Sequence, residues 1–131
     1  MKLQLNDLKH VSFHDGTLDA VNISEGNIEM TIDSRAIGPP LPETAGKEWI
    51  IREIKFTCEQ VSLNETELWT DTEKGLPHPT PQKPIYDILN TEVKDDFLEL
   101  SGFTEDQNWG VWKIKAESFT LAFKSQEEFK C

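Results

Sequence analysis

The feature that most constrains the fold is the stretch from Gly110 to Lys124, which alternates apolar and polar residues but changes its apolar parity halfway along. The two apolar sets are Trp112, Ile114 and Ala116, and then Phe119, Leu121 and Phe123. Alternation with a period of two is typical of a β-strand with one buried face. A one-residue change of parity predicts a β-bulge, which we place near Glu117 and Ser118.

A second stretch, Ile54 to Leu63, repeats this pattern. Its inward residues switch parity around Glu59 and Gln60, and it aligns without a gap to residues 112–121, with Lys, Glu and Leu at equivalent positions. Two matching long strands predict a duplicated β unit. The alternative is that any two amphipathic strands with outward Lys and Glu align tolerably well.

Two hairpins precede these long strands. The first joins residues 18–23 to residues 28–32 through Glu25-Gly26-Asn27, where the glycine supplies the positive φ that tight turns require. The second joins residues 85–93 to residues 97–103 through Lys94-Asp95-Asp96. Residues 1–15 are compatible with either a short strand or a helical turn.

Proline-rich connections separate the units. Residues 36–46 and 64–84 contain all seven prolines, which cannot donate ladder hydrogen bonds, so both are expected to be surface loops. The sequence therefore predicts one all-β domain over residues 1–131, an antiparallel sandwich or barrel built from two similar three-strand units. Each unit is a hairpin followed by a long bulged strand, and the internal repeat spans residues 17–63 and 85–124.

The charge of the chain restricts its partners. It has 24 acidic and 13 basic residues, a formal net charge of −11, which disfavours nucleic acid and anionic membranes and favours a basic protein partner. An acidic surface can also serve solubility alone. The first ten residues lack the apolar run of a signal peptide, and the two cysteines, Cys58 and Cys131, lie far apart, so we expect a reducing, cytoplasmic location.

No motif with a known catalytic mechanism occurs in the chain, so we expect no enzyme, no catalytic residue and no cofactor. His10, His14 and Asp15, with help from His78, could ligate a metal. We favour instead hydrogen bonds from His14 and Asp15 to the backbone, with Phe13 packed under the sheet, and assign no metal site. Residues 71–82 do not fit a calcium loop, because Gln82 stands where a bidentate Glu is needed.

Two tryptophans in expected loops are the best candidates for partner binding. Trp69 and Trp109 each lie beside acidic residues. Tryptophan dominates interface hot spots, and rim carboxylates accelerate the encounter with a cationic partner. The predicted partner-binding residues are Trp69, Asp71, Glu73, Glu105, Asp106 and Trp109. The alternatives are that both rings cover sheet edges, or that they stack on sugars.

The segment Ser12-Phe13-His14-Asp15-Gly16-Thr17-Leu18 resembles a group of small uncharacterised bacterial proteins that begin with an F-H-D-x-x-L element. Some of these resemble immunity proteins of polymorphic toxin systems. The resemblance implies a cytosolic antidote that covers the active site or substrate-binding surface of a toxin, and it transfers no binding residue. The acidic charge suits a nuclease toxin with a basic cleft.

Three functional hypotheses remain open. The first is a non-enzymatic protein-binding module, specifically an immunity protein that neutralises a toxin by charge complementarity and steric block. The second is a β-barrel or sandwich that binds a small ligand or carbohydrate in a pocket lined by aromatics such as Trp109 and Trp112. The third is an enzyme, which requires a buried group with a perturbed pKa in a cleft.

Overall fold

A computed structural model describes residues 2–13, 16–38, 49–122 and 125–128. Among these residues every regular element except one short 3₁₀ helix is a β-strand, which confirms the all-β prediction. The elements are β1 (Lys2–Leu3), η1 (Leu5–His10), β2 (Gly16–Ser24), β3 (Asn27–Gly38), β4 (Trp49–Trp69), β5 (Leu76–Pro77), β6 (Asp87–Val93), β7 (Leu98–Phe103), β8 (Trp109–Ala122) and β9 (Ser125–Glu128). The first residues therefore form both structures that the sequence left open, a short strand and a helical turn.

Six of the strands close into a ring. Their order around the ring is β2, β3, β4, β8, β7, β6 and back to β2, and each strand is antiparallel to both of its neighbours. Among the described residues the contact between β2 and β6 is short, with Gly16 opposite Ile88 and Thr17 opposite Asp87. A hydrogen bond continues it on each side, from the Leu18 amide to the Tyr86 carbonyl at 2.8 Å and from the Phe13 amide to Thr91 Oγ1 at 3.3 Å. The result is a barrel whose fold class agrees with the sequence prediction.

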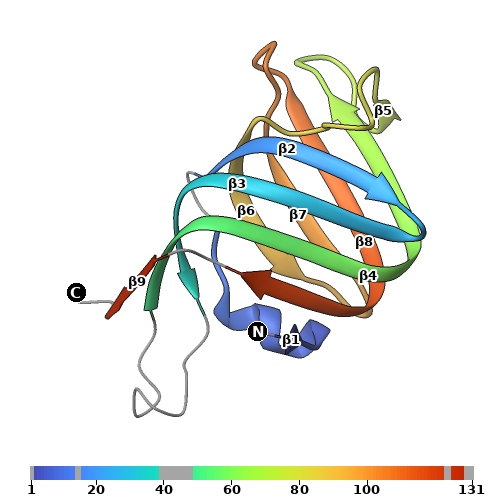
Figure 1. Ribbon diagram of the computed structural model, residues 1–131. Coiled ribbons are helices and arrows are strands. Elements are labelled where there is room, and N and C mark those ends of the chain that lie inside the picture. The colour runs from blue at the N-terminus through green and yellow to red at the C-terminus, as the bar shows by residue number, and fades with distance from the viewer. Residues whose placement is uncertain (1, 14–15, 39–48, 123–124, 129–131) are drawn as a thin grey trace.

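The ring consists of two three-strand units, each a hairpin followed by a long strand. β2, β3 and the first part of β4 cross in front of β6, β7 and the first part of β8 (Figure 1). Both units carry a register shift at a similar place, between Leu18 and Ala20 in β2 and between Ile88 and Asn90 in β6. The origin of the two units by duplication stays a prediction.

The long strands β4 and β8 run through both layers, because each bends at one corner of the barrel (Figure 1). On β8 the buried residues change parity between Ile114 and Phe119, as the sequence predicts. The predicted bulge near Glu117 and Ser118 is wrong, however, because the extra residue lies in β4, between Val61 and Leu63. A strand that passes from one layer to the other can turn its opposite face inward by bending.

The first hairpin supports this corner. Its turn residues Glu25 and Gly26 have φ values of 51° and 81°, which suit a two-residue turn between strands. The Gly26 carbonyl accepts a hydrogen bond from the Val61 amide at 2.7 Å. The Asn27 side chain accepts one from the amide of Gln60, whose φ is 53°, so the hairpin turn satisfies the backbone where β4 bends.

Apolar side chains fill the interior of the barrel. The strand residues of the core include Ile54, Phe56, Cys58, Trp112, Phe119 and Leu121, all predicted to face inward. Leu8 of η1 and Ile85, which precedes β6, also belong to this core. The ring therefore encloses a packed core, and any ligand site must lie on its outside or at its ends.

Two glycines let the chain approach closely at the upper end. A Cβ on Gly102 would lie 1.9 Å from the Asp87 carbonyl oxygen, and one on Gly110 would lie 2.2 Å from that of Pro84. Gly102 and Gly110 are ladder partners in β7 and β8. Their lack of side chains allows residues 84–87 to lie directly against these strands, which fixes the position of Tyr86.

Candidate functional site

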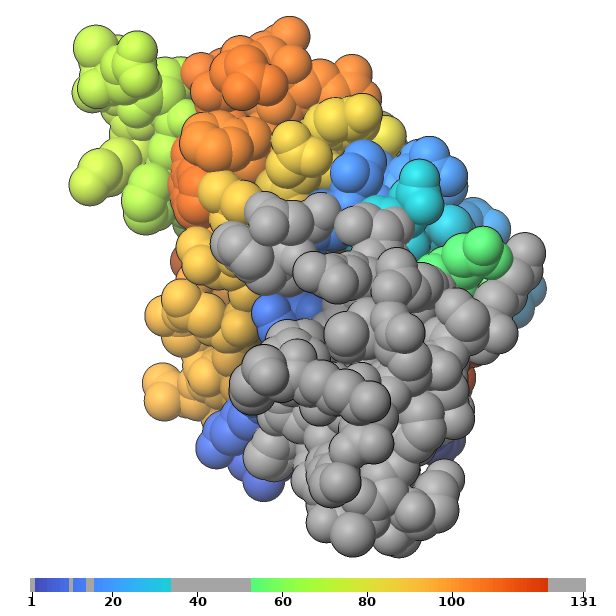
Figure 2. Space-filling model, turned by 90° about the vertical axis from the view of Figure 1, so that its left-hand side faces the viewer, coloured from blue at the N-terminus to red at the C-terminus, as the bar shows by residue number. Residues whose placement is uncertain are grey.

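The candidate site is the upper rim, which we define as residues 68–86 and 103–109. Here β4 ends, β5 and its flanking loops follow, and the connection from β7 to β8 turns. These segments gather at the same end of the molecule, in light green, yellow and orange (Figure 2). The six residues predicted as partner contacts all belong to the upper rim.

Trp69 and Trp109 lie in strands, so their predicted placement in loops is wrong. Trp69 is the last residue of β4, Trp109 is the first residue of β8, and the two are direct ladder partners. Cross-strand pairing holds them there, because β4 and β8 remain paired through 13 residue pairs up to this end. Both tryptophans are half-buried.

Neighbouring side chains orient both indole rings. The Trp69 Nε1–H donates to Glu67 Oε2 at 3.0 Å. The Trp109 ring packs edge-to-face on Phe103, with centroids 5.5 Å apart and an angle of 90° between the planes. Lys74 Nζ lies 5.3 Å from the centroid of the Trp69 ring, within the range of a cation–π contact.

The four predicted carboxylates of the upper rim, Asp71, Glu73, Glu105 and Asp106, are all exposed. Glu105 lies 3.6 Å from Lys83 Nζ, whereas the other three have no basic partner among the described residues.

At the opposite turn, between β6 and β7, lysines pair with Glu92, Asp96 and Glu99. The upper rim therefore keeps more of its negative charge available to a partner.

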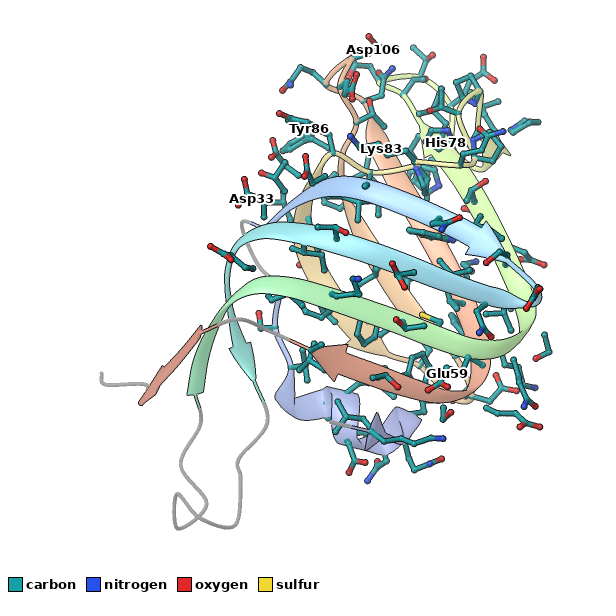
Figure 3. The ribbon with its side chains drawn as sticks, viewed as in Figure 1. Asp33, Glu59, His78, Lys83, Tyr86 and Asp106 are labelled. Atoms are coloured by element: carbon teal, nitrogen blue, oxygen red, sulfur yellow. The ribbon has the colours of Figure 1, made fainter. Side chains whose placement is uncertain are left out.

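A cavity of about 350 Å³ opens beside two of these carboxylates, Glu105 and Asp106. Its lining consists of Leu68, His78, Pro79, Thr80, Lys83, Ile85, Tyr86, Thr104, Glu105, Asp106 and Asn108. His78, Lys83, Tyr86 and Asp106 lie together at this end (Figure 3). Lys83 Nζ lies 5.4 Å from the centroid of the Tyr86 ring, and Tyr86 is 38% exposed.

The buried His78 side chain links Thr80 and Pro84 by two hydrogen bonds at this cavity. Its Nδ1 accepts a hydrogen bond from the Thr80 amide at 3.0 Å, so the proton of the neutral ring lies on Nε2. That Nε2–H donates to the Pro84 carbonyl at 2.8 Å. Both nitrogens are occupied by the protein itself, which leaves neither free to ligate a metal.

A smaller hollow of about 200 Å³ lies next to the cavity and shares Asn108 with it. It is lined by Trp69, Thr70, Asp71, Lys74, Phe103, Gln107, Asn108 and Trp109. We call this hollow the tryptophan slot. The two depressions together place aromatic rings, carboxylates and two lysines on one continuous end of the barrel.

Sequence reasoning missed several of these residues. Lys74, Lys83, Tyr86 and Phe103 were not predicted as contacts, although all four line the cavity or the slot. The sequence placed Tyr86 inside the predicted strand of residues 85–93, whereas β6 begins at Asp87. The signal that could have found Tyr86 is Pro84 two residues before it, because a proline marks a place where the chain leaves the ladder. Lys74 and Lys83 carried no such signal, because isolated lysines in loops are common.

The remaining candidate groups are the buried thiol of Cys58 and the potential metal ligands. Burial raises the pKa of the Cys58 thiol, which is fully covered by the core and faces no cleft. The part of the chain that the structure describes contains no group of three potential metal ligands. His14 and Asp15 lie outside the described residues, as does Cys131, and the side chain of His10 is not described.

Among the described residues, no helix combines the length and hydropathy that a bilayer span requires.

The described apolar members of the F-H-D-x-x-L element belong to the core. Phe13 and Leu18 are both completely buried, as the sequence predicts for Phe13. The Phe13 ring packs edge-on against Phe56 with centroids 5.2 Å apart. This part of the element therefore stabilises the barrel and offers no surface to a partner.

No protein-family model, no curated protein and no solved structure matches the chain.

Proposed function

We propose that this protein is a non-enzymatic binding module that recognises a basic protein surface with its upper rim. The observation that carries the proposal is the gathering of Trp69 and Trp109 with four exposed carboxylates at one end of the barrel. Half-buried aromatics supply contact area without much loss of conformational entropy, and unpaired rim charges attract a cationic partner.

The net charge of −11 supports the same partner class. At physiological ionic strength a rim charge acts over roughly 8 Å, so the carboxylates act mainly during the final approach. A basic partner would approach faster at low salt, while the aromatic contacts would set how long it stays.

Neutralisation of a bacterial toxin is the specific form of this function that we propose. It rests on the resemblance of residues 12–18 to small bacterial proteins of the F-H-D-x-x-L type. An antidote needs no catalytic group, since it acts by covering a functional surface. The proposed location, in the cytoplasm, follows from the same resemblance.

The test begins with capture of a partner from the native cell on immobilised protein, followed by binding kinetics with that purified partner. The rim variant combines Asp71→Asn, Glu73→Gln and Asp106→Asn. We expect its association rate to fall about ten-fold at low salt and the difference to shrink as salt rises, because screening removes steering.

A matched control combines Asp19→Asn, Glu25→Gln and Asp95→Asn, three exposed carboxylates away from the upper rim that change the net charge equally. The control should associate nearly as fast as the wild type. Equal losses in both variants would show a general charge effect and contradict the proposal. For the toxin assignment, coexpression of the partner with the wild type should rescue growth, and failure to rescue would reject it.

A second candidate function is binding of a small ligand, favoured by the cavity of about 350 Å³. Its volume falls within the range of small-molecule pockets, and it lies at a barrel end, where such pockets are common. Tyr86, Glu105, Asp106 and Asn108 provide a ring and polar groups suited to a hydroxylated ligand such as a sugar. A glycan and metabolite screen that yields no ligand sensitive to Tyr86→Ala would reject this candidate.

A further inference from the structure

The tryptophan slot has the size and the chemistry to hold one side chain. At about 200 Å³ it is smaller than the pockets that usually hold whole metabolites. Its lining residues include two tryptophans, Trp69 and Trp109, and one acidic residue, Asp71. Indole faces carry negative electrostatic potential, so both kinds of group favour a cation.

The protein already places a cation on this surface. Lys74 Nζ lies 5.3 Å from the Trp69 centroid and has no acidic partner among the described residues. The turn that carries Lys74 is held by the Thr70 amide, which donates to the Glu73 carbonyl at 2.8 Å. Lys74 itself is exposed, so its ammonium can leave the ring without disturbing the core.

We infer that the tryptophan slot receives an arginine side chain of the protein partner, which displaces Lys74 from the Trp69 ring. This inference rests on the proposed function, and it names the chemistry by which the upper rim holds its partner. Arginine fits better than lysine, because a planar guanidinium stacks on indole and can also donate to the Asp71 carboxylate. Lys74 acts as an internal competitor that occupies the ring until the partner arrives.

The test uses Nα-acetyl-L-arginine methylamide as the probe and follows the indole N–H resonances by NMR. Saturable shifts are expected for Trp69 and Trp109. Trp112 serves as the internal reference, because it is completely buried and its Nε1–H donates to Asn64 Oδ1 at 2.7 Å. The corresponding lysine derivative should bind more weakly, and glycerol should produce no saturable shift.

The Lys74→Met variant isolates the competition. It keeps an unbranched side chain that is one atom shorter and removes the charge, so affinity for the arginine probe should rise about two- to five-fold, the factor expected for loss of one exposed cation–π contact. Lys115→Met is the matched control, because it removes the same charge from a lysine in the middle of β8, outside the upper rim, where it pairs with Asp96. Asp71→Asn should weaken binding of the probe about two- to five-fold.

Each outcome decides the inference. An absence of saturable shifts in both the wild type and Lys74→Met would overturn it, and so would an equal gain in Lys74→Met and Lys115→Met. Tighter binding of tetramethylammonium than of the arginine probe would replace arginine by a quaternary ammonium and overturn the assignment. If the rim variant loses association with the captured partner while the slot binds no probe, the proposed function stands and this inference falls.

Discussion

In β4, the inward side chains from Ile54 to Cys58 are fully buried, whereas residues 64–69 at the end of the strand are exposed or half-buried. Ile54, Phe56 and Cys58 are buried as alternation predicts, since a period of two reports directly on which face meets the core. Residues 64–69 show no alternation, because this end of β4 extends beyond the core and both of its faces are exposed or half-buried. Only the ladder to β8 reveals it as strand.

The buried thiol of Cys58 gives a prediction about pH. Burial raises its pKa above the value of roughly 8.5 for an unfolded thiol, so the folded chain holds this proton more tightly than the unfolded chain. The corresponding stability is fully present below pH about 8.5 and is lost as the pH rises above it. Between pH 8.5 and 10, the wild type should lose up to about 1.4 kcal/mol per pH unit more than Cys58→Ala.

Urea unfolding of both proteins at several pH values measures this difference. The variant is expected to be less stable by about 1–2 kcal/mol at pH 7, because it loses buried contacts of the sulfur. Lysine, tyrosine and Cys131 are the same in both proteins and cancel in the comparison. Parallel pH profiles of the two proteins would refute the role of Cys58.

At the scale of elements, hairpins and long strands follow from the sequence, whereas the shortest strands do not. The turns at Glu25-Gly26 and Lys94-Asp95-Asp96 join the strands that the sequence predicted. β1 and β5 contain two residues each, too few to show any periodicity, and they exist because β8 and β4 offer them an edge. The bulge position was wrong for a related reason, since either strand of a pair can carry the extra residue.

The close approach of β7 to residues 84–87 predicts an unusual sensitivity at Gly102. Gly102→Ala should destabilise the protein by about 2–3 kcal/mol, because its Cβ would overlap the Asp87 carbonyl and force the backbone apart. Gly26→Ala is the control, since its Cβ would meet open space and the cost arises only from a φ of 81°. That control should lose about 1 kcal/mol, as measured by thermal unfolding. A larger loss at Gly26 than at Gly102 would contradict the packing argument.

For the molecule as one unit, the sequence predicts the fold class, and it predicts part of the clustering at the upper rim. It selected Trp69, Trp109 and their acidic neighbours from two segments distant in the chain, and the barrel brings these segments together. It could not place His78, Lys83 and Tyr86 beside them, because their position depends on how residues 76–86 cross the barrel end. Long-range closure of this kind leaves no local pattern.

Hydrogen exchange should reveal how unevenly the barrel is closed. Within the described ranges, β2 and β6 share two residue pairs, flanked by the Leu18 to Tyr86 and Phe13 to Thr91 hydrogen bonds, whereas β4 and β8 share 13 residue pairs. We expect the Leu18 amide to exchange at least ten-fold faster than hydrogen-bonded amides in the middle of the β4–β8 ladder, because opening the short contact breaks fewer bonds. Equal protection at both places would show that the ring opens only as one unit.

The brevity of that contact makes the ring a strip of six strands fastened at a single seam. Mechanical tension or mild denaturant would separate β2 from β6 first and let the strip flatten. The long β4–β8 ladder would still hold the two three-strand units together. The seam lies beside Tyr86, so a partner that packs on the Tyr86 side chain would also stabilise the closed barrel.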